Sequence, residues 1–264
     1  GRALLKANID NKYFDLVVVN DIDPDIDNHV YLIEYDSVYG KMQNHNVQTQ
    51  RNKLIIDGSE VIHFYSYSSI KDVPWDKHDV DIVIDASGVL NNVFDSKHLI
   101  NNSSVSKVII TFSPDKGVDA TILLGVNEDK YNKETHNVLS SSICDANAVA
   151  PFFKIINENF GIEIAEVTTL HPWLQYQNLL DGTVKSVSNP GHFWKDYALG
   201  RSSVSSLIPK KTSLVRALEE VLPGVSSIMN ATSFRVPTSN VSAADGVFLL
   251  SKEASIEEVL DKIS

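Results

Sequence analysis

The sequence predicts an α/β protein: a doubly wound domain followed by an α+β domain with a mixed or antiparallel sheet. In the first half, nearly continuous apolar segments that end in small polar residues alternate with helix-like segments, as in a doubly wound sheet. In the second half, a helix-like segment leads to segments in which apolar and polar residues alternate. We therefore expect two domains, residues 1–139 and 140–264.

Three segments of the first half are predicted to be buried parallel strands. They read FDLVVVN at 14–20, DIVIDASG at 81–88 and SKVIITFS at 106–113. The segment NNVFDSKHLINNS between the last two predicts a short helix over the sheet. The segment NKLIIDGSEVIHFYSY, at 52–67, alternates around an Asp-Gly pair and predicts an antiparallel hairpin added to that sheet.

The second half is predicted to begin with a helix over residues 145–160. Pro151 lies within this helix, and a helix tolerates proline only in its first turns or at a kink. Apolar residues at three- to four-residue spacing predict the face that meets the core, namely Val149, Phe152, Ile156 and Phe160. The remaining elements are predicted in the order strand (162–173), long loop (181–209), helix (212–222), two strands of an antiparallel sheet (226–252) and a final helical segment, SIEEVLDKIS.

Composition narrows the class of function. The chain has 264 residues, 43% of them hydrophobic, a net charge of -11 and scattered Lys and Arg, which argues against a nucleic-acid groove. It shows neither a signal-peptide pattern nor an apolar run of membrane-spanning length, and its one cysteine excludes an internal disulfide. We expect a protein of the reducing cytoplasm, either a small-molecule enzyme or a binding domain.

The first residues indicate a dinucleotide-binding unit. A helix and a strand follow Gly1, and Asp21 closes that strand twenty residues later (21 − 1), where the fingerprint places its ribose-binding acid. We interpret Gly1 as the last glycine of G-x-G-x-x-G. Both ends of the chain then read as cuts through a longer protein.

Cys144 is the only cysteine, and it stands directly before the predicted helix. The positive end of a helix macrodipole stabilises a thiolate, so this position suits a nucleophile. The alternative interpretation is an inert, buried small hydrophobe, which is the commoner fate of a lone cysteine.

Two further residues suit a nucleophilic cysteine. Such a cysteine requires a base, and TTLHPW places His171 at the end of a predicted strand, 27 positions after Cys144 (171 − 144). Arg235 lies within a predicted apolar strand, where an unpaired charge is costly to bury. It should therefore meet an anion, either a substrate group or a protein carboxylate.

These segments together resemble the signatures of the glyceraldehyde-3-phosphate dehydrogenase family. SSSICDANAVAP resembles the family's S-N-A-S-C-T-T-N-C-x-x-P, VTTLHP its T-T-V-H, and FRVPTSNVS its F-R-V-P-T-x-N-V-S. IDASGV resembles E-S-T-G-V, and GVNEDKY resembles G-V-N-x-x-x-Y. The resemblance spans essentially the whole chain, and with it we interpret Cys144 as the nucleophile.

The resemblance implies a Rossmann-type NAD-binding domain followed by an α+β catalytic domain built on a mixed sheet. It also implies an NAD-dependent phosphorylating aldehyde dehydrogenase that oxidises glyceraldehyde 3-phosphate or a related sugar phosphate, usually as a homotetramer. Cys144 would form a thioester, His171 would accept the proton, and inorganic phosphate would release the acyl group. The residues implied to bind NAD are Gly1, Arg2, Asp21, Ser87, Gly88 and Thr111. Those at substrate or phosphate positions are Asp145, Asn147, Thr212, Ser213 and Arg235. No metal is implied.

The sequence departs from the family where phosphate should bind. The small hydroxyl residues that flank the family's cysteine are Ile143 and Asp145 here, and the threonine three positions after its histidine is Leu174. A carboxylate beside an incoming phosphate repels it by about 1–4 kcal/mol at a separation near 4 Å. Two alternatives therefore stay open: a non-phosphorylating or different-substrate aldehyde dehydrogenase of the same fold, and a non-catalytic paralogue with a binding role.

Overall fold

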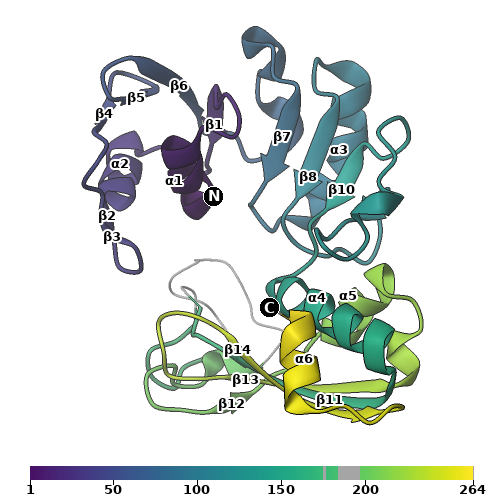
Figure 1. The fold of residues 1–264 in the computed structure, drawn as a ribbon. Coiled ribbons are helices and arrows are strands. Elements are labelled where there is room, and N and C mark those ends of the chain that lie inside the picture. The colour runs from purple at the N-terminus through teal and green to yellow at the C-terminus, as the bar shows by residue number, and fades with distance from the viewer. Residues whose placement is uncertain (175–176, 184–196, 264) are drawn as a thin grey trace. The chain divides into compact units, whose positions relative to one another are not determined.

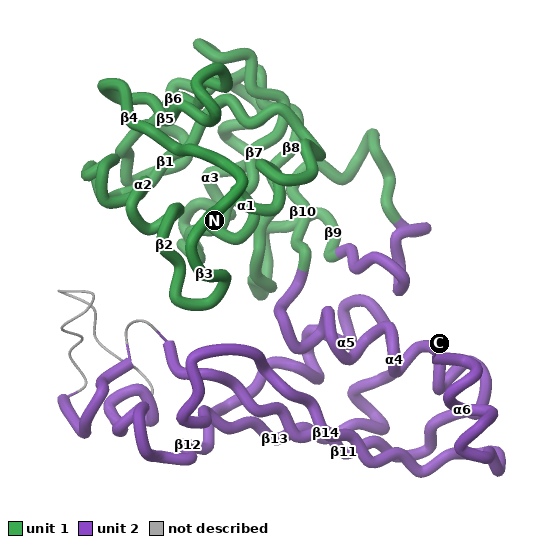
Figure 2. The backbone as a smooth tube through the Cα atoms, turned by 60° about the vertical axis from the view of Figure 1, so that its left-hand side comes forward, with its two compact units in different colours: residues 1–121, 131–141 green, residues 122–130, 142–264 purple. Residues whose placement is uncertain are grey.

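The computed structural model describes residues 1–174, 177–183 and 197–263. It divides into two compact units, residues 1–121 with 131–141 and residues 122–130 with 142–264 (Figure 2). This division differs from the expected boundary between residues 139 and 140. Residues 122–130 belong to the second unit because Leu123 and Val126 are buried in its apolar core.

The first sheet of unit one mixes parallel and antiparallel strands. Across the sheet the strands are β1 (Val18–Asn20), β6 (Glu60–Tyr65), β5 (Lys53–Ile56) and β4 (Val47–Thr49). β1 and β6 run parallel, whereas β6, β5 and β4 alternate in direction. Helices α1 (Arg2–Asn11) and α2 (Ile26–Glu34) complete the apolar core of this sheet. A short two-stranded ladder, β2 (Tyr35–Asp36) with β3 (Gly40–Lys41), follows α2.

The hairpin predicted at 52–67 is confirmed as β5 and β6. Asp57 and Gly58 form its turn with φ angles of 51° and 72°, and the Ser59 N–H donates to the Ile56 carbonyl at 3.2 Å. Two consecutive residues at positive φ make a type I′ turn, whose twist matches that of the flanking strands. The Asp-Gly pair indicates this hairpin because both residues tolerate that conformation.

The second sheet of unit one is parallel throughout. Its strands, in order, are β7 (Ile82–Asp85), β8 (Lys107–Ile110), β10 (Val138–Ser140) and β9 (Ala120–Thr121). The predicted helix is α3 (Leu90–Asn102), which packs against β8 and β10 (Figure 1). The parallel α/β class is confirmed, although β1, β7 and β8 are each shorter than the apolar segments that predicted them.

The two sheets of unit one share an apolar core but belong to separate hydrogen-bonded ladders. Val18 of β1 is buried in the same cluster as Val83 of β7 and Val108 of β8. The strand orders place β1 at one edge of the first sheet and β7 at one edge of the second. The single doubly wound sheet that the pattern predicts is therefore divided at this point within the described residues.

Unit two is built on one mixed sheet. Its strands, in order, are β12 (Ile208–Pro209), β13 (Met229–Arg235), β11 (Ile162–His171) and β14 (Ala243–Leu250). β13 runs parallel to β11, whereas β14 runs antiparallel to β11 on its other side. The two strands predicted in 226–252 both form, but they are not neighbours, because β11 lies between them.

Three α-helices of unit two are described: α4 (Cys144–Phe160), α5 (Leu214–Val221) and α6 (Ile256–Ile263). α4 contacts α5, α6 and β11 (Figure 1). It continues past Pro151, so this proline lies inside the helix and not in its first turns. The buried stripe of α4 contains Phe153 in place of the expected Phe152, which is only partly buried.

Short 3-10 turns fill several connections: η1 (Ile70–Asp72), η2 (Trp75–His78), η3 (Glu128–Lys130), η4 (Tyr197–Gly200) and η5 (Val225–Ser227). The loop predicted at 181–209 is described only in part, because residues 184–196 lie outside the described residues. Across the part of the chain that the structure describes, no helix has both the length and the apolar character needed to cross a membrane.

Candidate active site

The buried face of β11 changes from apolar to polar along the strand. Ala165 and Val167 lie in the apolar core of unit two, whereas Thr169 and His171 are buried polar residues. Alternate residues of a strand share one face, so all four side chains face the same side of the sheet. His171 therefore stands at the carboxyl end of β11, as predicted, on the face that packs against α4.

The first turn of α4 brings a carboxylate between the cysteine and the histidine. Cys144 is the first helical residue and is exposed, whereas Asp145 is only 5% exposed. The Cys144 thiol donates to Asp145 Oδ1 at 3.5 Å, and the same oxygen lies 3.0 Å from His171 Nε2. The three residues each offer one ligand atom within 4.8 Å of the others. Cys144 and His171 thus meet through Asp145.

The partners of His171 assign its neutral tautomer. Nε2 lies 3.2 Å from Thr169 Oγ1 as well as beside the Asp145 carboxylate, and Thr169 donates its own hydroxyl hydrogen to Ser233 at 2.8 Å. Both partners of Nε2 are thus acceptors, which places a hydrogen on Nε2. Nδ1 faces the Ser242 hydroxyl at 3.4 Å and accepts from it.

The charge state of this cluster differs from the expectation for a thiol at a helix start. Partial burial raises the pKa of Cys144, and the negative charge of Asp145 raises it further. The expected stabilised thiolate is therefore wrong for this arrangement. Burial would raise the pKa of Asp145 as well, but its contact with His171 and the nearby positive charge of Lys210 outweigh burial, and the pKa of Asp145 is lowered. Asp145 is consequently ionised at neutral pH.

Arg235 is the last residue of β13 and pairs in register with His171 across the parallel strands. Its guanidinium is half-buried and donates from Nη1 to the Pro172 carbonyl at 2.9 Å. The Val236 N–H in turn donates to the His171 carbonyl at 2.8 Å. The sheet thus fixes an arginine at the level of the histidine.

The remaining predicted phosphate residues are engaged at helix starts. The Asn147 amide donates to the Ile143 carbonyl at 2.9 Å, and Asn147 is exposed. Thr212 Oγ1 accepts from the Leu214 N–H at 3.1 Å, and Ser213 is the N-cap residue of α5. The first belongs to the start of α4 and the other two to the start of α5.

Sequence reasoning missed three residues around the cluster: Lys210, Ser242 and Thr169. Thr169 and Ser242 contact the histidine ring directly. Lys210 precedes α5 and acts on the cluster through its charge. A Lys-Lys-Thr run before a predicted helix was the available signal for Lys210, whereas nothing in the local pattern marks Ser242.

The predicted NAD-binding residues all lie in unit one. α1 begins directly after Gly1, where a Cβ would meet nothing within 4 Å, and Arg2 is its first residue. Asp21, half exposed, directly follows β1. Ser87, Gly88 and Thr111 follow the carboxyl ends of β7 and β8, which is the edge where open α/β sheets bind ligands.

These positions fit a dinucleotide. The Leu5 N–H donates to the Gly1 carbonyl, so the N–H groups of residues 2–4 stand at the start of α1 without an acceptor in the helix, as a pyrophosphate requires. Gly88 has a φ of 72° with open space around it, which permits a close approach of its backbone. The half-exposed Asp21 carboxylate can accept hydrogen bonds from ribose hydroxyls.

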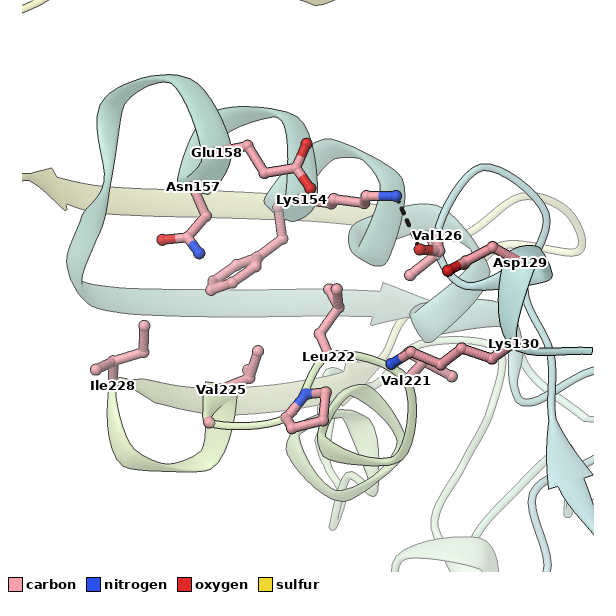
Figure 3. A pocket seen from close by; sticks show the side chains of 13 residues that line it. Val126, Asp129, Lys130, Lys154, Asn157, Glu158, Val221, Leu222, Val225 and Ile228 are labelled. Carbon is pink, nitrogen blue, oxygen red and sulfur yellow. Dashed lines mark hydrogen bonds between the residues drawn. The ribbon is translucent and has the colours of Figure 1, made fainter.

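A separate hollow of about 400 Å³ lies in unit two between α4, α5 and residues 126–130 (Figure 3). Lys154 crosses one side of it and donates to the Val126 carbonyl at 2.8 Å (Figure 3). Its lining contains none of the predicted site residues. We therefore place the candidate site at the Cys144 cluster and not in this hollow.

Comparison with known proteins identifies two matching family models. Residues 1–93 match "Glyceraldehyde 3-phosphate dehydrogenase, NAD binding domain", and residues 143–264 match "Glyceraldehyde 3-phosphate dehydrogenase, C-terminal domain". Glyceraldehyde-3-phosphate dehydrogenase 1 of Kluyveromyces lactis is 37% identical over 98% of this chain and 74% of its own length. The glyceraldehyde-3-phosphate dehydrogenase of Geobacillus stearothermophilus is 35% identical over 98% of this chain and 73% of its own length.

Proposed function

This chain belongs to the glyceraldehyde-3-phosphate dehydrogenase family, and from that premise we propose how its residues oxidise an aldehyde with NAD. The observation that carries the proposal is the cluster of Cys144, Asp145 and His171, in which a solvent-accessible thiol touches a buried carboxylate–imidazole pair. A nucleophile, a proton acceptor and a group that orients the acceptor are the parts that covalent catalysis requires.

NAD is held by unit one in this proposal. Gly1, Arg2 and the N–H groups at the start of α1 would hold the pyrophosphate, and Asp21 would accept from the ribose hydroxyls. Ser87, Gly88 and Thr111, which follow the ends of β7 and β8, would border the cofactor. When bound, NAD supplies the hydride acceptor that converts a thiohemiacetal into a thioester.

Cys144 forms the covalent bond to substrate. Its sulfur attacks the aldehyde carbon while the thiol proton passes to the aldehyde oxygen, so that a neutral thiohemiacetal forms. Asp145, which the thiol contacts at 3.5 Å, relays this proton and does not keep it, because its own pKa is lowered whereas that of Cys144 is raised. The Nε2–H of His171 holds Asp145 in place, and the imidazole accepts the hydroxyl proton when the thiohemiacetal is oxidised. The sequence expectation gave proton acceptance to His171 and did not include the relay.

The acyl acceptor is inorganic phosphate in the leading version of the proposal. Arg235 and Lys210 supply positive charge near the cluster, and Asn147, Thr212 and Ser213 are the further candidate ligands. The phosphate oxygen attacks the thioester carbon and Cys144 leaves as the thiolate. The aldehyde would be glyceraldehyde 3-phosphate or a related sugar phosphate.

A specific observation favours water as a second candidate acceptor. The buried Asp145 carboxylate stands beside the reacting sulfur, and it repels a phosphate dianion but can hydrogen-bond a water molecule. Release of the acyl group as a free acid would make the enzyme non-phosphorylating.

One experiment tests both versions. Aldehyde oxidation is followed by the absorbance of NADH, with and without phosphate or arsenate. Acceleration by either anion supports phosphorolysis, and a rate that is indifferent to both supports hydrolysis. A full-length protein that binds NAD in calorimetry but oxidises no aldehyde would contradict the proposal and favour a non-catalytic binding role.

We further propose a homotetramer in the cytoplasm. The face of the unit-two sheet opposite α4 exposes apolar side chains that suit a subunit interface: Ile164, Leu170, Val247 and Leu249. A reducing compartment suits catalysis by the free thiol of Cys144. Sedimentation equilibrium tests the assembly, and a monomer at micromolar concentration would contradict it.

A further inference from the structure

The three residues of the catalytic cluster offer three different ligand types to a metal ion. Cys144 Sγ, one carboxylate oxygen of Asp145 and Nε2 of His171 all lie within 4.8 Å of one another. Sulfur, carboxylate oxygen and imidazole nitrogen are the ligands that Zn²⁺ uses in proteins. The resemblance to the dehydrogenase family implies no metal, so this set is a property of the present chain, which has Asp145 beside its cysteine.

The spacing of these atoms suits a single tetrahedral ion. Zn–S bonds of about 2.3 Å and Zn–N or Zn–O bonds of about 2.0–2.1 Å place ligand atoms about 3.3–3.6 Å apart. The thiol sulfur lies 3.5 Å from Asp145 Oδ1, and that oxygen lies 3.0 Å from His171 Nε2. The sulfur and Nε2 lie within 4.8 Å of each other, so a rotation of the exposed Cys144 side chain that moves the sulfur by up to about 1 Å would complete this geometry.

We propose that Cys144, Asp145 and His171 bind one Zn²⁺ ion. The exposed side of Cys144 leaves the fourth coordination position open to water. On binding, the thiol proton is released to solvent and the sulfur binds as the thiolate. The Nε2 hydrogen of His171 is also lost, and a hydrogen on Nδ1 replaces it.

The surroundings of the cluster allow this rearrangement. The Ser242 hydroxyl, which faces Nδ1 at 3.4 Å, can accept from an Nδ1–H as readily as it donates to a bare Nδ1. A hydrogen-bond partner on the second ring nitrogen is the usual support of a metal-bound histidine. Lys210 opposes a cation by its charge, which limits the affinity without removing a ligand.

Zn²⁺ at this site would inhibit the dehydrogenase reversibly, a consequence that rests on the proposed function. The same sulfur lone pair cannot bond to the metal and attack an aldehyde, and Asp145 cannot relay the thiol proton while it binds the ion. Substrate and Zn²⁺ therefore compete for Cys144. Mg²⁺ should have no such effect, because it prefers oxygen ligands in octahedral geometry.

The test measures metal binding first and inhibition second. Full-length protein is titrated with Zn²⁺ in competition with a chromophoric chelator, and with Co²⁺ while the sulfur-to-metal charge-transfer absorption is recorded. We expect one ion per chain, with the charge-transfer band absent in Cys144→Ser. Even an outer-sphere change typically weakens metal binding about 10–100-fold, so Asp145→Asn should weaken it about 100-fold or more.

His45 supplies the matched control. Its two ring nitrogens face different carboxylates, Asp57 at 2.7 Å and Asp10 at 3.3 Å, so no single ion can bind all three. His45→Asn should leave Zn²⁺ affinity unchanged. Asp145→Thr serves as a second variant if Asp145→Asn does not fold, as judged by circular dichroism.

The outcomes separate the metal site from the proposed function. If Zn²⁺ abolishes dehydrogenase activity and a chelator restores it, the result supports both the metal site and the proposed function. Sulfur-dependent metal binding by a protein without dehydrogenase activity supports the site and contradicts the function. An active enzyme in which wild type and Asp145→Asn bind Zn²⁺ equally overturns the site.

Discussion

Two helix starts in this molecule have similar backbones and opposite electrostatics. Neither α1 nor α4 has a side-chain cap hydrogen bond, and both present the positive end of the helix dipole. The first turn of α1 has no acidic residue, and it begins with Arg2. The first turn of α4 contains Asp145, whose charge raises the pKa of Cys144 together with partial burial. At the start of α4, partial burial and the adjacent carboxylate together oppose the helix dipole, so the thiolate is not stabilised.

The largest effect should come from removing the α4 nucleophile. Cys144→Ser should lower aldehyde oxidation by about 10³-fold or more, because a serine hydroxyl without a matched base is a far weaker nucleophile than sulfur. Initial rates of NADH formation measure this, and NAD binding by the variant serves as the control. Substantial turnover in the variant would refute the nucleophile assignment.

The next largest effect should come from removing the acidic side chain at the start of α4, so that this helix start, like that of α1, has no carboxylate in its first turn. In the wild type the pKa of Cys144 is raised, so the thiolate fraction at neutral pH is below that of a free thiol, and iodoacetamide should label Cys144 more slowly than a small thiol. The labelling rate should still increase with pH above the ordinary titration range of a thiol. Asp145→Thr removes the carboxylate, shifts this profile to lower pH and should accelerate labelling at neutral pH on the order of tenfold.

Labelling followed by mass spectrometry across pH checks this prediction. Asp15→Thr, at an exposed position of unit one that is not at positive φ, is the matched control and should leave the profile in place. An unchanged profile for Asp145→Thr would mean that the carboxylate does not govern the thiol.

A third, smaller effect concerns the α1 side of the comparison. Asp21→Asn should weaken NAD binding by about tenfold, close to 1.4 kcal/mol, because a neutral amide accepts ribose hydroxyls less strongly. It should also narrow the preference for NAD over NADP, since a 2′-phosphate no longer meets a like charge. Calorimetric titration with both nucleotides measures this, with Asp23→Asn as control. If Asp21→Asn and Asp23→Asn weaken NAD binding equally, Asp21 is not the residue that binds the ribose.

The smallest expected effect separates capping from catalysis. At the start of α2, Asp25 accepts from the Asn28 N–H at 3.1 Å and acts as a true N-cap. Asp25→Ala should therefore lower the free energy of unfolding by about 0.5–2 kcal/mol and leave the reactivity of Cys144 unchanged. Denaturant titration together with alkylation rates tests this. A change in alkylation would show that carboxylates at helix starts act on Cys144 from a distance.

The sequence predicts elements better than it predicts their contacts. The hairpin at Asp57-Gly58 and helix α3 could be predicted because turn chemistry and helical periodicity are local signals. The choice of Phe152 over Phe153 failed because a 3.6-residue period leaves the helix phase uncertain by one residue. The sequence did not predict that β11 lies between β13 and β14, because strand order depends on long-range packing.

The candidate site shows the same limit. The family motifs identify Cys144, His171 and Arg235 as residues of one site, and the structure places His171 and Arg235 in register. The contact between Asp145 and His171 spans 26 residues and depends on how α4 packs on β11, so no local pattern indicates it. That contact lowers the pKa of Asp145, whose negative charge adds to partial burial in raising the pKa of Cys144.

The parallel pairing of β11 and β13 makes the site sensitive to chain length as well as to residue identity. Seven consecutive residue pairs, from Ala165–Met229 to His171–Arg235, bring the arginine level with the histidine. Because side chains alternate between the faces of a sheet, deleting one residue within β13 would turn the arginine to the opposite face. Deletion of one residue from β13 should therefore reduce activity far more than most substitutions at the same positions. Gene variants that change the length of this strand should be interpreted differently from those that change only its residues.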